Sequence, residues 1–155
     1  MVDEFDVVST YPGFQRFLSY SLAQIDGTSA LDMVATILVS GNTYLVYFRN
    51  YGTDASPNFG FVNNYFDTRL SIGTDFFTDY ETVTAGDMDE DGDADLIIGG
   101  RYYEIDTGWK SSVRYFEQTS SQYWTERDNY LSLVDAWVNK EPWLPRVSMV
   151  DFDND

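Results

Sequence analysis

The chain has 155 residues with 26 acidic and 9 basic side chains, a formal net charge of −17, and neither histidine nor cysteine. The missing residue types exclude Ser-His-Asp and Cys-His nucleophilic sites and the usual zinc ligand sets. The negative charge argues against nucleic acid as a partner, and no apolar run comes near the roughly 18 residues that a membrane-spanning helix needs.

The N-terminal stretch is acidic and lacks the apolar core of a signal peptide, so we place any export signal outside this sequence. We interpret residues 1–14 as a linker or as the end of a preceding structural unit. Phe17–Ala23 then alternates apolar and polar side chains, which predicts a strand. No segment sustains a 3.6-residue apolar period, so the sequence predicts an all-β protein with little helix.

A polar loop, residues 24–32, follows this first strand. Oxygen atoms recur at every second position, from the side chains of Gln24, Asp26, Thr28 and Asp32 and from the main-chain carbonyl of Ala30. Beyond the loop, Tyr44–Asn50 and Phe59–Val62 are rich in aromatic and β-branched residues and predict further strands. The polar turn Gly52–Pro57 separates these two strands.

Residues 87–95 read D-M-D-E-D-G-D-A-D, with five aspartates in nine residues. Two carboxylates about 4 Å apart repel by roughly 4 kcal/mol at an effective dielectric of about 20, so the cluster favours a bound cation. Calcium prefers oxygen ligands supplied at alternate positions of a tight loop. Asp87, Asp89 and Asp91 take the first, third and fifth positions, Gly92 supplies the sharp turn, the Asp93 carbonyl is the seventh-position ligand, and Asp95 closes the site.

Two other interpretations of this acidic loop compete with a calcium site. An EF-hand needs a bidentate glutamate at loop position twelve and a helix on each side, but that position is Ile98. The flanks Glu81–Gly86 and Leu96–Gly99 instead predict strands. The second alternative is a solvated acidic turn without metal, as runs of charge usually are. The regular alternation of aspartates around one glycine favours calcium over that alternative.

The polar loop and the acidic loop follow one pattern. Gln24–Met33 aligns without gaps to Asp87–Leu96, 63 residues later (87 − 24). Neutral oxygens replace two carboxylates in the first copy, so we expect a weaker or vestigial metal site there. The following strands also correspond, Tyr44–Asn50 to Ser112–Gln118, with about five extra residues in the second copy. A third copy begins 64 residues after Asp87 (151 − 87), where Asp151, Asp153 and Asp155 would start a partial site.

The motif D-x-D-x-D-G-x-x-D-L, followed by an apolar strand and V-x-Y-F, resembles the FG-GAP/VCBS repeats of integrin α-type β-propellers. The resemblance implies four-stranded antiparallel blades, each with a calcium loop between its first two strands. It divides the chain into two complete blades, residues 15–77 and 78–141, and the start of a third at 142–155. It also implies that the aspartates of residues 87–95 are calcium ligands that stiffen the rim of a propeller.

Aromatic side chains make up 17% of the chain. Most are expected to fill the space between sheets, which is their ordinary role in β-rich proteins. A sharper hypothesis places some of them on loops, as sugar-stacking platforms or protein-binding anchors. The candidates are Trp109, Trp137 and Trp143. Trp109 stands next to Gly108 and Lys110, which suggests an exposed hairpin tip.

These features predict a noncatalytic module rather than an enzyme. We expect calcium to stabilise a structural or adhesive propeller segment of a secreted or cell-surface protein that binds glycan or protein. Low-affinity calcium modules suit an exterior with millimolar calcium. Neighbouring blades, from the same chain or from other copies, are further expected partners. Two alternatives stay open: an accessory propeller of a polysaccharide-active enzyme, and a subunit of a self-assembling extracellular fibre.

Overall fold

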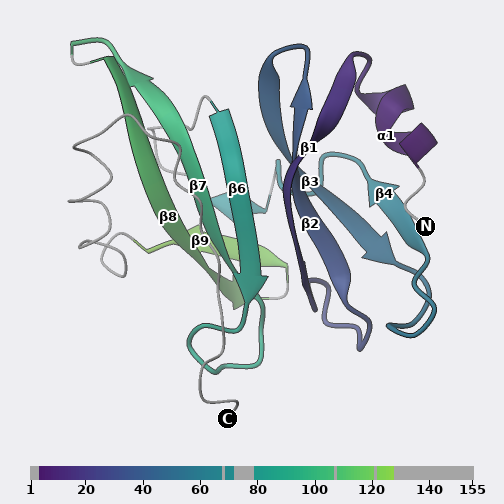
Figure 1. Cartoon of the computed structure of the whole chain (residues 1–155). Helices are drawn as coiled ribbons and strands as arrows, with labels where there is room; N and C mark the ends of the chain where they lie inside the picture. Colours follow the sequence, from purple (N-terminus) through teal and green to yellow (C-terminus); the bar gives the residue numbers. More distant parts are fainter. Residues whose placement is uncertain (1–3, 68, 72–78, 107, 121, 128–155) are drawn as a thin grey trace.

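The computed structural model describes residues 4–67, 69–71, 79–106, 108–120 and 122–127. These residues form two β-sheets that pack against each other and one short helix, α1 (Glu4–Thr10), beside the first sheet (Figure 1). The prediction of a mostly β protein is therefore confirmed. Two ligand-binding candidates, Trp137 and Trp143, and the partial loop with Asp151, Asp153 and Asp155 lie outside the described residues.

The first sheet is an antiparallel meander with the strand order β1-β2-β3-β4. Its strands are β1 (Phe14–Ala23), β2 (Asp32–Val39), β3 (Asn42–Asn50) and β4 (Phe59–Val62). A two-residue turn joins β2 to β3, and its residues Ser40 and Gly41 have positive φ angles of 49° and 87°. Positive φ at both positions matches the twist of the paired strands, which explains the glycine in so short a link.

The second sheet has the strand order β5-β9-β8-β7-β6. Four of its strands form another antiparallel meander, namely β6 (Asp79–Gly86), β7 (Asp95–Glu104), β8 (Gly108–Ser120) and β9 (Tyr123–Glu126). The short strand β5 (Leu70–Ser71) runs parallel to β9 at the edge. The β7–β8 hairpin extends beyond the end of β6 (Figure 1), because the extra residues of the second copy lengthen it.

The two sheets share one hydrophobic core. The first sheet contributes Val34 and Tyr47, and the second contributes Leu96, Phe116 and Trp124. Each of these five residues is at most 1% exposed. Complete burial of a large apolar side chain contributes roughly 1.5–3 kcal/mol, so this shared core is the main source of attraction between the sheets.

The sheets are stacked the same way round. Met33 lies opposite Phe48 in the first sheet, and their aligned counterparts, Leu96 and Phe116, lie opposite each other in the second. The first pair belongs to the apolar cluster on the outer face of its sheet, whereas the second pair belongs to the core between the sheets. Each sheet therefore turns the corresponding face toward the N-terminal side of the stack.

Helix α1 covers part of the outer face of the first sheet. Val7 is 1% exposed and joins the apolar cluster that contains Met33, Ala35 and Phe48. Both faces of β2 are buried as a result, which accounts for the nearly unbroken apolar sequence of this strand. The sequence did not predict α1, because its seven residues are too few to display a helical period.

Two serines of β1 connect this strand to β6 of the second sheet. Ser19 Oγ lies 3.2 Å from the carbonyl oxygen and 3.3 Å from the amide nitrogen of Val83. Ser21 Oγ lies 3.4 Å and 3.0 Å from the same atoms of Ala85. Each hydroxyl can thus donate to the carbonyl and accept from the amide. These bonds satisfy backbone groups at the strand edges, where unpaired groups would invite another chain.

We expect Ser21→Ala to lower the free energy of unfolding by about 1–2 kcal/mol, because the Ala85 amide loses its acceptor in a partly buried position. The matched control is Ser29→Ala on the exposed surface of the polar loop, which should change stability by less than about 0.5 kcal/mol. Urea denaturation followed by fluorescence measures both. Equal losses in the two variants would contradict a connecting role for Ser21.

The part of the chain that the structure describes contains two open sheets and no closed one. No helix among the described residues is long and apolar enough to cross a membrane.

Candidate metal centre

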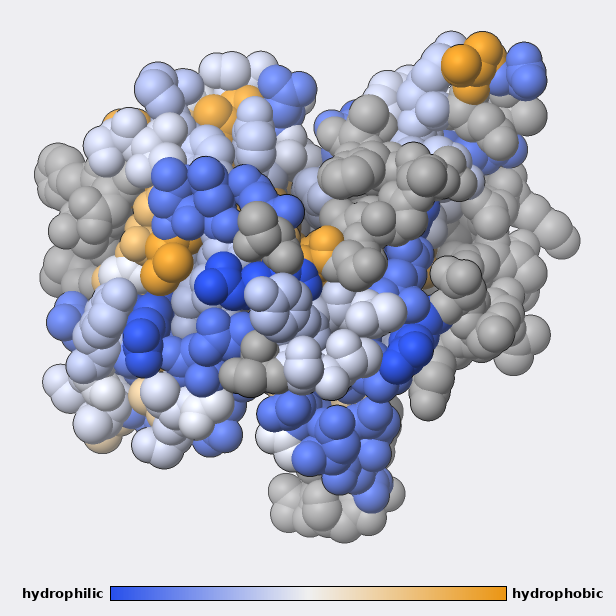
Figure 2. Space-filling model, turned by 180° about the vertical axis from the view of Figure 1, so that it is seen from behind, coloured by the Kyte–Doolittle hydropathy of each residue, from blue (hydrophilic) through white to orange (hydrophobic). Residues whose placement is uncertain are grey.

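The acidic loop joins β6 to β7 at one end of the second sheet (Figure 1). Both flanks are strands, as the sequence predicted, so the helices that an EF-hand requires are not present on either side. Hydrophilic side chains gather on the projection at the lower end of the molecule, where this loop lies (Figure 2). The loop is therefore accessible to ions from the solvent.

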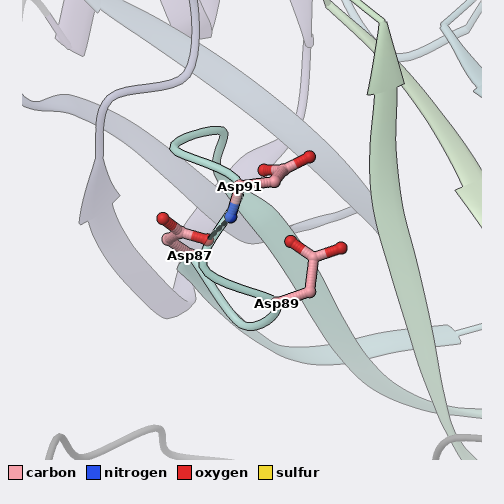
Figure 3. Close-up of side chains that lie close together, drawn as sticks. All are labelled: Asp87, Asp89 and Asp91. Carbon is pink, nitrogen blue, oxygen red and sulfur yellow. Dashed lines mark hydrogen bonds between the residues drawn. The ribbon is translucent and has the colours of Figure 1, made fainter.

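Three aspartates of this loop bring their carboxylates together. Asp87, Asp89 and Asp91 each offer one oxygen atom, and the three oxygens lie within 4.8 Å of one another (Figure 3). All three side chains are exposed. They occupy the alternate positions at which the sequence predicts side-chain ligands. Among the described residues, no other group of three acidic, histidine or cysteine side chains comes as close together.

Backbone amides of the loop hold two of these carboxylates. Asp87 accepts hydrogen bonds from the amides of Asp91 at 3.1 Å and Gly92 at 2.9 Å, and Asp91 accepts one from the amide of Asp93 at 2.9 Å. Gly92 has a φ of 91°, in the region that favours glycine, so the sharp turn depends on this residue. The loop therefore fixes Asp87 and Asp91 through its own main chain.

Asp95, which the sequence predicts as the ligand that closes the site, is built into the sheet. It is 0% exposed, and its Oδ1 accepts a hydrogen bond from the Gln118 amide at 2.9 Å. Its Oδ2 accepts from the Tyr115 hydroxyl at 2.8 Å and from the Met88 amide at 3.1 Å. Burial and the bond to Asp95 raise the pKa of Tyr115, which keeps the hydroxyl a donor. Neither Asp95 nor Asp93 belongs to the group of three converging carboxylates.

Negative charge in this loop carries an electrostatic penalty. Partial desolvation, together with the charges of Asp95 and Asp91, raises the pKa of Asp89. Burial also raises the pKa of Asp95, although its hydrogen bonds oppose that shift. Both directions mean that the ionised form of these two carboxylates is disfavoured in the loop. A divalent cation beside the three converging oxygens would supply a counter-charge.

Tyr115 and Trp124 both fix the acidic loop, although the sequence did not predict a role for either residue. Tyr115 donates to Asp95, as described above, and Trp124 Nε1 donates to the Ala94 carbonyl at 2.8 Å. Tyr47 and Tyr115 occupy the same position in the two copies of the repeat, and the equivalent aspartates Asp32 and Asp95 precede them. This correspondence could have predicted that the tyrosine pairs with the aspartate in each copy. Trp124 has no such correspondence, because its aligned region in the first copy contains no tryptophan.

The polar loop of the first sheet has the same inner anchor. Asp32 is 0% exposed and accepts hydrogen bonds from the Tyr47 hydroxyl at 2.8 Å and the Asn50 amide at 2.7 Å. The counterparts of these residues in the second copy are Asp95, Tyr115 and Gln118, which make the corresponding bonds. Each copy therefore has its own buried hydrogen-bond network beneath its loop, and the two networks are equivalent.

The outer part of the polar loop is different. Asp26 accepts a hydrogen bond from the Thr28 amide at 3.0 Å, and the Gln24 side chain donates to the Ser29 carbonyl at 3.4 Å. Arg49 Nε lies 2.8 Å from Asp26 Oδ2. No group of three acidic side chains converges in this loop among the described residues. The predicted weaker site therefore has fewer anionic ligands and already contains a positive charge.

Trp109, the one described member of the three candidate ligand-binding tryptophans, lies near the end of the β7–β8 hairpin and is 46% exposed. The Arg101 guanidinium lies over its ring at 4.6 Å, and the Tyr103 ring centre is 5.5 Å away in an edge-on arrangement. Trp109 is thus accessible to solvent on the hairpin and in contact with Arg101 and Tyr103.

Comparison with protein-family models, with curated proteins and with solved structures found no match. The fold and the site define a class in structural terms: a mostly β protein of two stacked, largely antiparallel sheets with an acidic loop between β6 and β7 of the second sheet.

Proposed function

We propose that residues 87–95 bind a calcium ion. The observation that carries the proposal is the convergence of Asp87, Asp89 and Asp91, whose oxygens lie within 4.8 Å on an exposed loop. None of the ion pairs among the described residues includes any of these aspartates. Calcium accepts oxygen ligands in a flexible geometry, whereas magnesium demands a stricter octahedral arrangement.

The remaining ligands come from the loop and from water. The resemblance to FG-GAP/VCBS repeats points to the Asp93 carbonyl and to Asp95. Asp95 already accepts three hydrogen bonds, and an ionised carboxylate has about four acceptor sites. Asp95 therefore has room for about one metal contact, and its main role is to hold the loop on the sheet.

Calcium would act by stabilising the folded chain. Binding only to the native state stabilises it by about 2.7 kcal/mol at a ligand concentration about 100 times Kd. We expect Asp89→Asn to weaken calcium binding and to lower the melting temperature in calcium but not in chelator. Isothermal titration and thermal melting with calcium or with EDTA measure these effects.

The matched control for this experiment is Asp106→Asn, an exposed aspartate on the β7–β8 hairpin, outside the acidic loop. It removes the same charge and should leave the difference between calcium and EDTA unchanged. If Asp89→Asn retains the full calcium-dependent stabilisation, Asp89 is not a ligand and the proposed site is wrong.

We further propose that the two sheets are successive blades of a calcium-stabilised propeller segment with an adhesive or structural, noncatalytic role outside the cell. The shared network under both loops and the stacking of the sheets in the same orientation support this arrangement. Glycan or protein would be the partner. A glycan array probed with the calcium-loaded chain tests the first of these partners, and silence across the array would leave protein.

A further inference from the structure

The polar loop of the first sheet contains a cation of its own. Arg49, on β3, places its Nε 2.8 Å from Asp26 Oδ2. The Asp26 side chain is only 5% exposed, whereas the Arg49 side chain is 42% exposed. Asp26 occupies the third loop position, which is the position of Asp89 in the acidic loop. A buried carboxylate at a metal-ligand position is therefore neutralised by a guanidinium.

The equivalent place in the second sheet has the opposite charge. Arg49 and Glu117 each follow the phenylalanine that lies opposite the second residue of β2 or β7, so they occupy the same position. Glu117 accepts two hydrogen bonds from the Arg127 guanidinium, at 2.8 Å and 2.9 Å. The acidic loop thus has a carboxylate where the polar loop has a guanidinium.

The polar loop also holds oxygen atoms that its own hydrogen bonds do not satisfy. Asp26 Oδ2 and Thr28 Oγ1 are buried and have no hydrogen-bond partner among the described residues. The contact of Asp26 Oδ2 with Arg49 is an ion pair without hydrogen-bond geometry. Buried oxygens without hydrogen-bond partners call for an explanation. At Asp26 Oδ2 the Arg49 guanidinium, 2.8 Å away, supplies a compensating positive charge.

We propose that Arg49 takes the place of the metal ion in the polar loop, and that the charge at this strand position decides whether a loop binds metal. With arginine there, the loop is closed by a side chain and excludes calcium by repulsion. With glutamate there, at position 117, the loop keeps its negative charge and binds the ion. The inference rests on the proposed calcium site only for this comparison with the second loop.

The first test measures the ion pair without any metal. Arg49→Gln in excess EDTA should lower the folding equilibrium constant about tenfold, because the buried Asp26 charge loses its partner. Adding Asp26→Asn to Arg49→Gln should recover most of that loss. Urea denaturation of the two single variants and the double variant gives the coupling between the residues. Independent, additive effects would overturn the proposal, whatever the acidic loop binds.

The second test measures exclusion of calcium. An Asp89→Asn background weakens the acidic loop, and in isothermal titration with calcium chloride the binding that depends on Asp26 then reports on the polar loop. We expect no binding at this loop with Arg49 present, and a gained site in Arg49→Gln that is lost again when Asp26→Asn is added. Binding that is sensitive to Asp26 while Arg49 is present would overturn the proposal, as would the absence of any gain in Arg49→Gln.

The two tests separate this inference from the proposed function. If the unmodified chain binds no calcium at all, the site at residues 87–95 fails, but the coupling of Arg49 to Asp26 in EDTA still stands or falls by itself. If calcium binding is lost with Asp89→Asn and the coupling is absent, the site holds and the role of Arg49 fails.

Discussion

Asp95→Ala is expected to lower the free energy of unfolding by about 3–5 kcal/mol, even in EDTA. The change removes the acceptor of the Gln118 amide, the Tyr115 hydroxyl and the Met88 amide at a position that is 0% exposed. A buried donor that loses its acceptor costs about 1–3 kcal/mol, and partial entry of water keeps the sum below three full penalties. Urea denaturation in EDTA measures the loss.

The control variants separate an anchoring aspartate from a metal-binding one. Asp89→Ala in EDTA should change stability by less than about 0.5 kcal/mol, because Asp89 is exposed. Asp32→Ala, at the equivalent position of the first sheet, should also destabilise the fold in EDTA but somewhat less than Asp95→Ala, because it removes the acceptor of two donors, Tyr47 and Asn50. A loss for Asp95→Ala seen only in calcium would contradict the anchoring role.

Trp124→Ala is expected to cost about 4–5 kcal/mol, the upper part of the range for truncating a buried aromatic side chain. Trp124 is 0% exposed in the core between the sheets, where its ring centre lies 5.5 Å from that of Phe66. The truncation also removes the bond from Nε1 to the Ala94 carbonyl at the end of the acidic loop. Calcium affinity should therefore fall together with stability.

Two variants test this dual role. Trp124→Phe keeps most of the ring but removes the indole donor, so it should cost about 1–2 kcal/mol and weaken calcium binding. Trp109→Ala removes the same side chain from a position that is 46% exposed, and it should cost less than about 1 kcal/mol with no effect on calcium. Similar losses at positions 109 and 124 would contradict the packing described here.

Those parts of the fold that follow local rules could be predicted from the sequence. The alternation of apolar and polar side chains in Phe17–Ala23 predicted β1, because side chains on a strand alternate between two faces. The aromatic and β-branched run Tyr44–Asn50 predicted β3. The alternate spacing of Asp87, Asp89 and Asp91 predicted that their carboxylates lie close together, because a tight loop turns alternate residues inward. Each of these predictions needs only the residues within one short segment.

The rest depends on contacts between distant segments. The burial of Asp95 results from donors on β8, which no pattern within residues 87–95 reveals. The ion pair between Asp26 and Arg49 joins a loop to the third strand of the sheet, 23 residues away (49 − 26). Helix α1 is stabilised by packing on the first sheet rather than by its own period. Local sequence could not specify any of these contacts.

The orientation of the two sheets has a consequence for growth and assembly. The corresponding faces of the two sheets point in the same direction along the stack. The stack therefore has a polarity, with a different face of the sheet at each end. A third sheet stacked in the same orientation would be related to the second as the second is to the first, and not by a twofold axis. Repetition of one such step closes into a ring if the rotation closes and otherwise gives an open helical filament.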